Sequence, residues 1–351
     1  MELFDPARHQ PLSGTWDEAD ARAAIAAIVA ETEAAFDPER LWPPHPGDGD
    51  AGRTTLYMGA AGVMFALARL GGDWRAALAT LPARYRAQPD TGEAVPSYFL
   101  GEVGLLAAAG AEPERMAALI EANLANPTLE ALWGAPGTML PALWRFRAGG
   151  EPRWRDLWLA NARHLIDTWI HHDDPGCHLW TQDLYGEVVR LLGAGHGFAG
   201  NVFALAAGLD VLPPADAALV VDRAVATLAA TAIRRDGLTN WLPHVGRPRR
   251  GREPILVQWC HGAPGMITGL AALPPSPELD ALLAEGGELT WAAGPLAKGP
   301  GLCHGTAGNG YAFLVLHARS RDPRWLVRAR AFAAHAIGQY RVARAEHGRG
   351  R

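Results

Sequence analysis

Two of the three cysteines in this 351-residue chain lie in segments that nearly repeat each other. Residues 259–265 read Trp-Cys-His-Gly-Ala-Pro-Gly, and residues 302–308 read Leu-Cys-His-Gly-Thr-Ala-Gly. In a protein of the reducing cytosol, matched cysteines of this kind indicate a shared metal ion. The thiolates of Cys260 and Cys303 and the imidazole of His304 would fill three of zinc's four tetrahedral positions. The open fourth position predicts a catalytic zinc centre.

The third cysteine has a different setting. Cys177 follows a polar run, His-His-Asp-Asp-Pro-Gly, at residues 171–176. This run resembles a metal cluster in composition, but it lies outside the repeated segments. We therefore expect Cys177 to lie in a connecting loop.

A Gly-x-x-Gly sequence followed by an apolar stretch occurs six times. The copies begin at Gly59, Gly101, Gly134, Gly197, Gly262 and Gly305. Each apolar stretch predicts a buried helix, and the intervening segments are one-sided amphipathic helices, several of which begin with proline. No stretch alternates long enough to predict a strand. An all-α fold with inner and outer helices follows, which is an α/α toroid.

Composition predicts one soluble domain over residues 1–351. The chain is 49% hydrophobic and has a formal net charge of −5, so it offers no basic field for nucleic acid. The N-terminus lacks the basic and apolar regions of a signal peptide, and no apolar run reaches the length of about 18 residues that a membrane span requires. We expect a cytoplasmic protein with no membrane span.

The glycine repeats together with the two cysteine motifs resemble the lanthionine synthetase C-like (LanC-like) family over nearly the whole chain. The resemblance implies an α/α toroid, a zinc ion held by Cys260, Cys303 and His304, and thiol addition to dehydroalanine or dehydrobutyrine residues of a peptide or protein. The family ring usually has seven inner helices, whereas six repeats are present here. We therefore expect a ring without its seventh inner helix, because the chain is truncated at its C-terminus or a partner fills the gap.

Three features resemble the glutathione-binding branch of the family: His261, the Ser-Tyr-Phe-Leu-Gly sequence at residues 97–101, and Lys298 five residues before Cys303. Dedicated peptide cyclases usually carry an arginine where this chain has Leu256. The resemblance thus implies glutathione as the thiol, with Lys298 and His261 in substrate binding, although residues 2–7 hold no match for that branch's N-terminal arginine. A lanthipeptide cyclase that forms intramolecular thioethers and a non-catalytic zinc- or thiol-binding scaffold are the alternatives.

Two further residues are candidates for acid–base chemistry. His196 precedes its Gly-x-x-Gly sequence as Cys260 and His304 precede theirs, so the repeat predicts that its imidazole faces the same end of the toroid as the metal. An imidazole with a pKa near 6.5 exchanges protons at neutral pH. Glu130 lies four residues before Gly134, where cyclases often have an aspartate. A catalytic role and a capping role are both open for Glu130.

Overall fold

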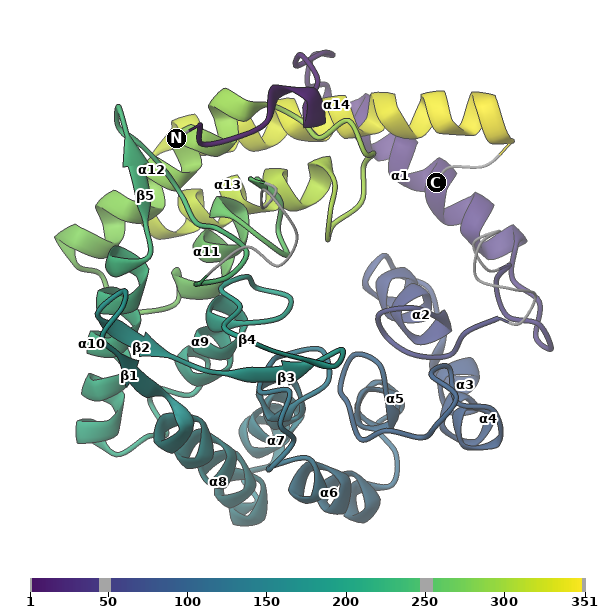
Figure 1. The fold of residues 1–351 in the computed structure, drawn as a ribbon. Coiled ribbons are helices and arrows are strands. Elements are labelled where there is room, and N and C mark those ends of the chain that lie inside the picture. Colours follow the sequence, from purple (N-terminus) through teal and green to yellow (C-terminus); the bar gives the residue numbers. More distant parts are fainter. Residues whose placement is uncertain (1, 44–51, 247–254, 349–351) are drawn as a thin grey trace. The chain divides into compact units, whose positions relative to one another are not determined.

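The computed structural model describes residues 2–43, 52–246 and 255–348 of the chain (Figure 1). Helices make up most of the described residues, as the sequence predicts. None of the described helices is both long enough and apolar enough to cross a membrane.

Each of the six repeat glycines is the N-cap residue of a helix. These helices are α2 (Ala60–Arg69), α5 (Glu102–Ala109), α7 (Ala135–Gly149), α9 (Phe198–Ala206), α11 (Ala263–Leu270) and α13 (Thr306–Ser320). A Cβ on the second glycine of the motif would collide with the preceding loop: it would lie 2.1 Å from the carbonyl oxygen of Trp259 at Gly265, and 1.9 Å from that of Leu302 at Gly308. Glycine therefore lets each loop pack directly on the first turn of its helix.

The remaining helices alternate with these six. They are α1 (Glu18–Ala34), α3 (Arg75–Leu78), α4 (Leu81–Ala87), α6 (Pro113–Ala122), α8 (Pro152–Thr168), α10 (Pro214–Ala230), α12 (Pro277–Ala293) and α14 (Pro323–His347), with a short 3₁₀ helix η1 (Pro6–Arg8) before them. Five begin with proline, which has a backbone preset for the first helical position. α8 shows the expected one-sided burial, because Trp154, Trp158 and Leu165 are fully buried while its other face is polar.

The expectation of no strands is wrong. The structure contains three antiparallel hairpins, each of two three-residue strands: β1 (Ile170–His172) with β2 (Cys177–Leu179), β3 (Gln182–Leu184) with β4 (Glu187–Val189), and β5 (Ile233–Arg235) with β6 (Leu238–Asn240). Three residues are too few for polar and apolar positions to alternate visibly. Cys177 is likewise no loop residue, because it lies buried in β2.

The contacts between residues divide the chain into two compact units. The larger unit consists of Met1–Ala24 and Ile166–Arg351, and the smaller unit is Ile25–Leu165. In the larger unit, α11 packs between α9 and α13, and α12 and α14 contact α11 and α13 respectively. That the two units form one domain stays a prediction.

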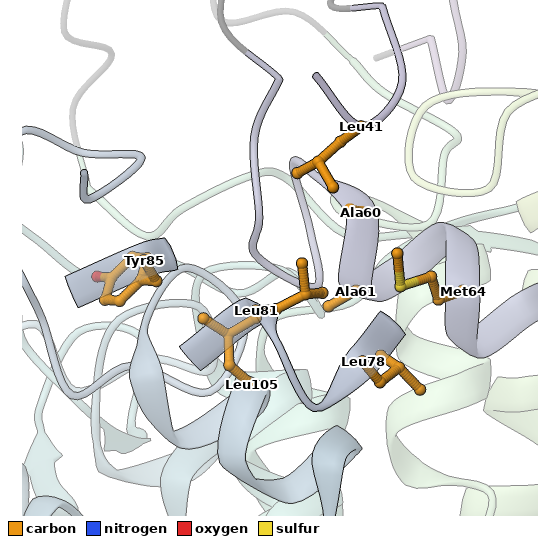
Figure 2. Close-up of a cluster of buried hydrophobic side chains, with 8 residues drawn as sticks. All are labelled: Leu41, Ala60, Ala61, Met64, Leu78, Leu81, Tyr85 and Leu105. Carbon is orange, nitrogen blue, oxygen red and sulfur yellow. The ribbon is translucent and has the colours of Figure 1, made fainter. Parts of the chain in front are cut away.

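One buried cluster of the smaller unit consists of apolar side chains from α2, α3, α4 and α5 together with Leu41 (Figure 2). Met64, Leu81 and Tyr85 are fully buried in it. The outer flank of α2 is less covered, since Phe65 and Leu70 are about half exposed. An apolar groove of about 640 Å³ lies between α1 and this helix.

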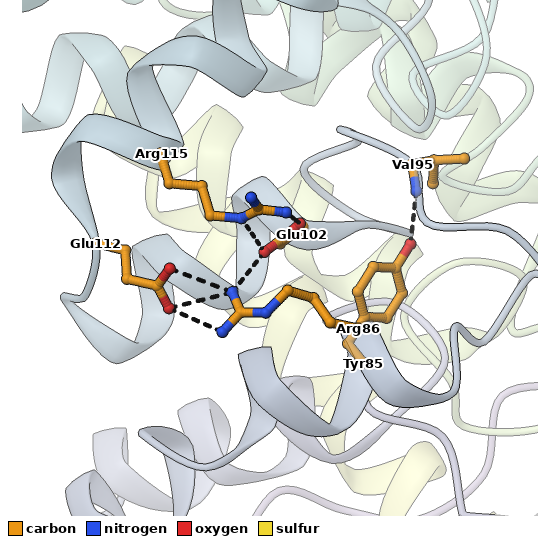
Figure 3. Close-up of polar contacts among 6 residues, drawn as sticks. All are labelled: Tyr85, Arg86, Val95, Glu102, Glu112 and Arg115. Atoms are coloured by element: carbon orange, nitrogen blue, oxygen red, sulfur yellow. Dashed lines mark hydrogen bonds and ion pairs between the residues drawn. The ribbon is translucent and has the colours of Figure 1, made fainter.

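A buried carboxylate joins α4, α5 and α6 in the smaller unit (Figure 3). The side chain of Glu102 is 2% exposed, and it accepts hydrogen bonds from Arg115 at 2.6 and 2.7 Å and from Arg86 at 2.7 Å. Arg86 also pairs with Glu112 at 3.1 Å. Burial alone would raise the pKa of Glu102, but the two guanidinium groups hold this pKa below its usual value.

We expect Glu102→Gln to lower the free energy of unfolding by about 2 to 4 kcal/mol at pH 7, because two arginines lose a buried partner. A carboxyl group whose pKa is lower in the folded state stabilises the fold above its unfolded pKa of about 4.3. The difference between wild type and variant should therefore shrink as pH falls through the folded pKa. Urea unfolding at pH 7 and pH 3 measures it. Glu114→Gln is the control, since Glu114 forms an exposed pair with Arg153.

Candidate metal centre

The two cysteine motifs meet in the larger unit at the starts of α11 and α13. Cys260 lies three residues before Ala263, the first residue of α11, and Cys303 lies three residues before Thr306, the first residue of α13. The backbone N–H of Cys260 donates to the carbonyl oxygen of Cys303 at 3.2 Å. Because both cysteines sit at helix N-termini, the helix dipoles favour their thiolate forms.

The sulfurs of Cys260 and Cys303 and a ring nitrogen of His304 lie within 4.8 Å of one another. Tetrahedral zinc with Zn–S bonds of 2.3 Å requires ligand atoms about 3.5 to 3.8 Å apart, so a small contraction would complete the site. Cys260 is buried, and Cys303 and His304 are partly exposed, which leaves one side open to solvent. All three cysteines of the chain are free thiols. The donor set therefore fits a metal ion with an open position.

The electrostatics of the thiol pair agree with this fit. The hydrogen bond with Cys303, together with burial, raises the pKa of the Cys260 thiol. Two buried thiolates at this separation repel each other, so without a cation the protonated form of Cys260 is favoured. A cation between the two sulfurs would remove this repulsion and stabilise both thiolates.

Three amide side chains that the sequence analysis did not select hold the candidate metal loops, those of Cys260 and Cys303, in place. Gln258 is buried and donates its Nε2 hydrogen to the sulfur of Cys260 at 3.0 Å. Asn240 accepts from the backbone N–H of Ala263 at 3.0 Å and so caps α11. Asn309 donates to the carbonyl oxygen of Val257 at 2.9 Å. Two of these residues could have been selected by their position in the sequence. Gln258 lies two residues before a proposed ligand, and Asn309 directly follows the Gly-x-x-Gly of its repeat.

His196, His261 and His304 occupy equivalent positions, since each directly precedes the N-cap glycine of α9, α11 or α13. The rings of His196 and His261 lie nearly parallel, with centroids 6.4 Å apart. A Cβ on Gly195 would lie 3.3 Å from the Cβ of Cys260, so the backbone next to His196 touches a metal loop. The structure therefore brings the His196 ring next to that of His261, and the backbone before His196 against Cys260.

Lys298 is exposed on the loop before Cys303, and it is the chain's only lysine. An N-terminal strap, residues 3–13, runs along this loop. The carbonyl oxygen of Arg8 accepts from the backbone N–H of Ala297 at 2.9 Å, and the N–H of Gln10 donates to Pro295 at 2.8 Å. This pairing places Arg8 opposite Ala297, the residue that precedes Lys298. The side chain of Arg8 is exposed. Arg8 directly follows residues 2–7, which contain no arginine.

Glu130 belongs to the smaller unit. It is fully buried, and its carboxylate accepts from the backbone N–H groups of Leu132 at 3.0 Å and Trp133 at 2.5 Å. These bonds order the turn that leads into α7, which fits the capping role. A catalytic role for Glu130 stays a prediction.

Comparison with known proteins gives the same family as the motifs. The model of the lanthionine synthetase C-like proteins matches residues 50–350. The chain belongs to the LanC-like family. Members of this family include enzymes, and nisin cyclase has the same fold: it superposes on 94% of this chain and 88% of its own length, with a TM-score of 0.59 and 14% identity. The predicted α/α toroid class is thereby confirmed.

Two curated relatives share local sequence with this LanC-like chain. Glutathione S-transferase LANCL1 of Danio rerio is 43% identical over 97 residues, which are 27% of this chain and 23% of that protein. LanC-like protein GCL1 of Arabidopsis thaliana is 43% identical over 84 residues, which are 23% of this chain and 19% of that protein. The aligned segments thus span less than a quarter of either relative's length.

Proposed function

We propose that this chain is a zinc-dependent enzyme that adds a thiol, glutathione, to dehydroalanine or dehydrobutyrine residues of peptides or proteins in the cytoplasm. The observation that carries the proposal is the convergence of Cys260, Cys303 and His304 at two neighbouring helix N-termini. The His196 ring lies next to that of His261, which follows Cys260 in the chain. Three donors with an open side suit a metal that must also accept a substrate.

A zinc ion held by Cys260, Cys303 and His304 would lower the pKa of a thiol substrate, which is near 8.5 when free, so that the thiol would lose its proton to solvent at neutral pH. The sulfur forms a bond to the β-carbon of the dehydroamino acid, and the α-carbon must receive one proton as the double bond is lost. His196 supplies that proton and recovers one from solvent, since its side chain is partly exposed. His261 lines the site between His196 and Cys260, and Gln258 orients the Cys260 sulfur.

Glutathione is favoured as the thiol by charge. It carries two carboxylates, and the backbone pairing of Arg8 with Ala297 brings the cation Arg8 near Lys298, on the loop that precedes Cys303. The zebrafish relative, named as a glutathione S-transferase, supports the same co-substrate. Leu256 stands where cyclases usually carry arginine, which disfavours the cyclase alternative.

A direct test is to incubate the zinc-loaded protein with glutathione and a peptide that contains one dehydroalanine and one distant cysteine. We expect the peptide to gain the mass of one glutathione faster than in a protein-free control. Loss of glutathione dependence, with ring closure through the peptide's own cysteine, would identify a cyclase. No acceleration of either reaction would leave the scaffold alternative.

For Lys298→Ala we expect the KM for glutathione to rise about three- to tenfold while kcat changes little, because an exposed charge-assisted contact contributes modestly to binding. The KM for 2-mercaptoethanol, which has no carboxylate, should not change. Steady-state kinetics with both thiols make the comparison, and Arg235→Ala, at an exposed hairpin, is the control. An equal rise for both thiols would remove Lys298 from the carboxylate site.

A further inference from the structure

The hairpin β3–β4 carries an unusual residue at its tip. Its two-residue turn is Tyr185-Gly186, with φ values of 54° and 76°. The hairpin β5–β6 has a turn of the same form, Asp236-Gly237, with φ values of 54° and 76°. Positive φ at both positions favours Asn-Gly or Asp-Gly, whereas a bulky aromatic residue is strained there. The chain therefore uses an ordinary residue at one turn and a costly one at the other.

The base of the β3–β4 hairpin is firmly held. The buried side chain of Gln182 accepts from the N–H of Leu191 at 2.8 Å, and the N–H of Leu192 donates to Pro243 at 2.9 Å. The first bond connects the hairpin to the segment that leads to His196. The second bond holds that segment against Pro243. The tip is nevertheless exposed, since Tyr185 is 69% exposed, so burial does not explain the tyrosine.

The ring of Tyr185 contacts the proposed proton donor. Its centroid lies 6.0 Å from that of His196, with an interplanar angle of 75°, which is an edge-to-face arrangement. His261 lies near the same imidazole, nearly parallel to it. Edge-to-face pairs prefer a defined relative orientation of the two rings. The Tyr185 ring is therefore placed to favour one orientation of the partly exposed His196 side chain.

We propose that Tyr185 is a positioning residue that holds the His196 imidazole in the orientation required for proton transfer. Strain at an exposed turn points to function when the strained residue touches a reacting group. This inference rests on the proposed function, because it assigns the reaction to His196. It adds the β3–β4 hairpin to the catalytic apparatus, outside the glycine repeats.

Tyr185→Asn is the informative variant, because asparagine is favoured at this turn and removes the ring. We expect unchanged or higher thermal stability, unchanged zinc content and an unchanged KM for glutathione, with kcat lowered about three- to tenfold. Tyr185→Phe keeps the ring and should restore kcat. Asp236→Asn, at the matching turn, is the control and should leave kcat unchanged.

An NMR measurement separates this proposal from the proposed function. The His196 ring protons, assigned by their loss in His196→Asn, should shift in Tyr185→Asn but not in Tyr185→Phe, because the tyrosine ring current is lost. If wild type adds no glutathione, the proposed function fails, and an unchanged His196 signal would separately overturn the contact. A raised KM for the peptide with unchanged kcat would instead make Tyr185 a substrate contact and overturn the positioning role.

Discussion

Cys260→Ser should release the metal and abolish thiol addition together. A serine hydroxyl is a poor zinc ligand at neutral pH, so only two of the three proposed donors remain. We expect the bound zinc to fall from about one equivalent to less than about 0.2, and kcat to fall at least about 10³-fold, since the thiol would lose both its activation and its fixed position next to the substrate. Elemental analysis after dialysis and the mass-based addition assay measure the two effects on the same sample.

Cys177→Ser is the matched control, because Cys177 is also a buried free thiol of the larger unit but belongs to hairpin β1–β2. It should retain zinc and activity, with at most a loss of stability. Wild type stripped by a chelator should behave like Cys260→Ser, and added zinc should restore wild type alone. Full metal content and full activity in Cys260→Ser would contradict the proposed ligand set.

Local sequence was sufficient to predict the helices that carry the site. The repeat glycines could be recognised because each one permits a loop to pack on a helix start, a constraint that any side chain would break. The clustering of Cys260, Cys303 and His304 could be expected from their equivalent places in two repeats, since equal positions on neighbouring helices lie at the same end of both. The same reasoning predicts that His196 faces this end, and its ring does lie next to that of His261.

Contacts between distant segments could not be predicted in this way. The bond from Asn240 to the carbonyl oxygen of Leu3, at 2.7 Å, joins residues that are far apart in sequence, and no periodic pattern reports such a pair. The pairing of Arg8 with Ala297 is equally non-local. Both bonds attach the N-terminal strap to segments that support the metal loops. Residues of this kind become visible only when the chain is folded.

The short hairpins were missed for a different reason. Three-residue strands carry too little pattern, even in β5–β6, where the turn Asp236-Gly237 is of the usual kind. In β3–β4 the turn Tyr185-Gly186 also lacks the asparagine or aspartate by which such turns are usually recognised. The residue that makes the turn hard to predict is the one that contacts His196. At this turn, local stability favours asparagine or aspartate, whereas the proposed function requires an aromatic ring. Sequence rules based on local stability therefore failed here.

His196→Asn should separate metal binding from proton transfer. The imidazole is not one of the three clustered donors, so we expect zinc content and the KM for glutathione to remain near their wild-type values. Asparagine occupies a similar volume but cannot donate a proton at neutral pH, and general acid catalysis typically contributes 10²- to 10⁴-fold. The value of kcat should therefore fall by about that factor.

The control is His171→Asn, which changes an exposed histidine of hairpin β1–β2 and should leave kcat unchanged. Addition carried out in D₂O gives a second readout, because the transferred proton ends on the α-carbon. If His196 delivers it to one face, wild type should give a single stereoisomer at that carbon. His196→Asn should give a mixture, since solvent then protonates both faces. Loss of zinc in His196→Asn would instead make this histidine a ligand, and the proton would have to come from another residue.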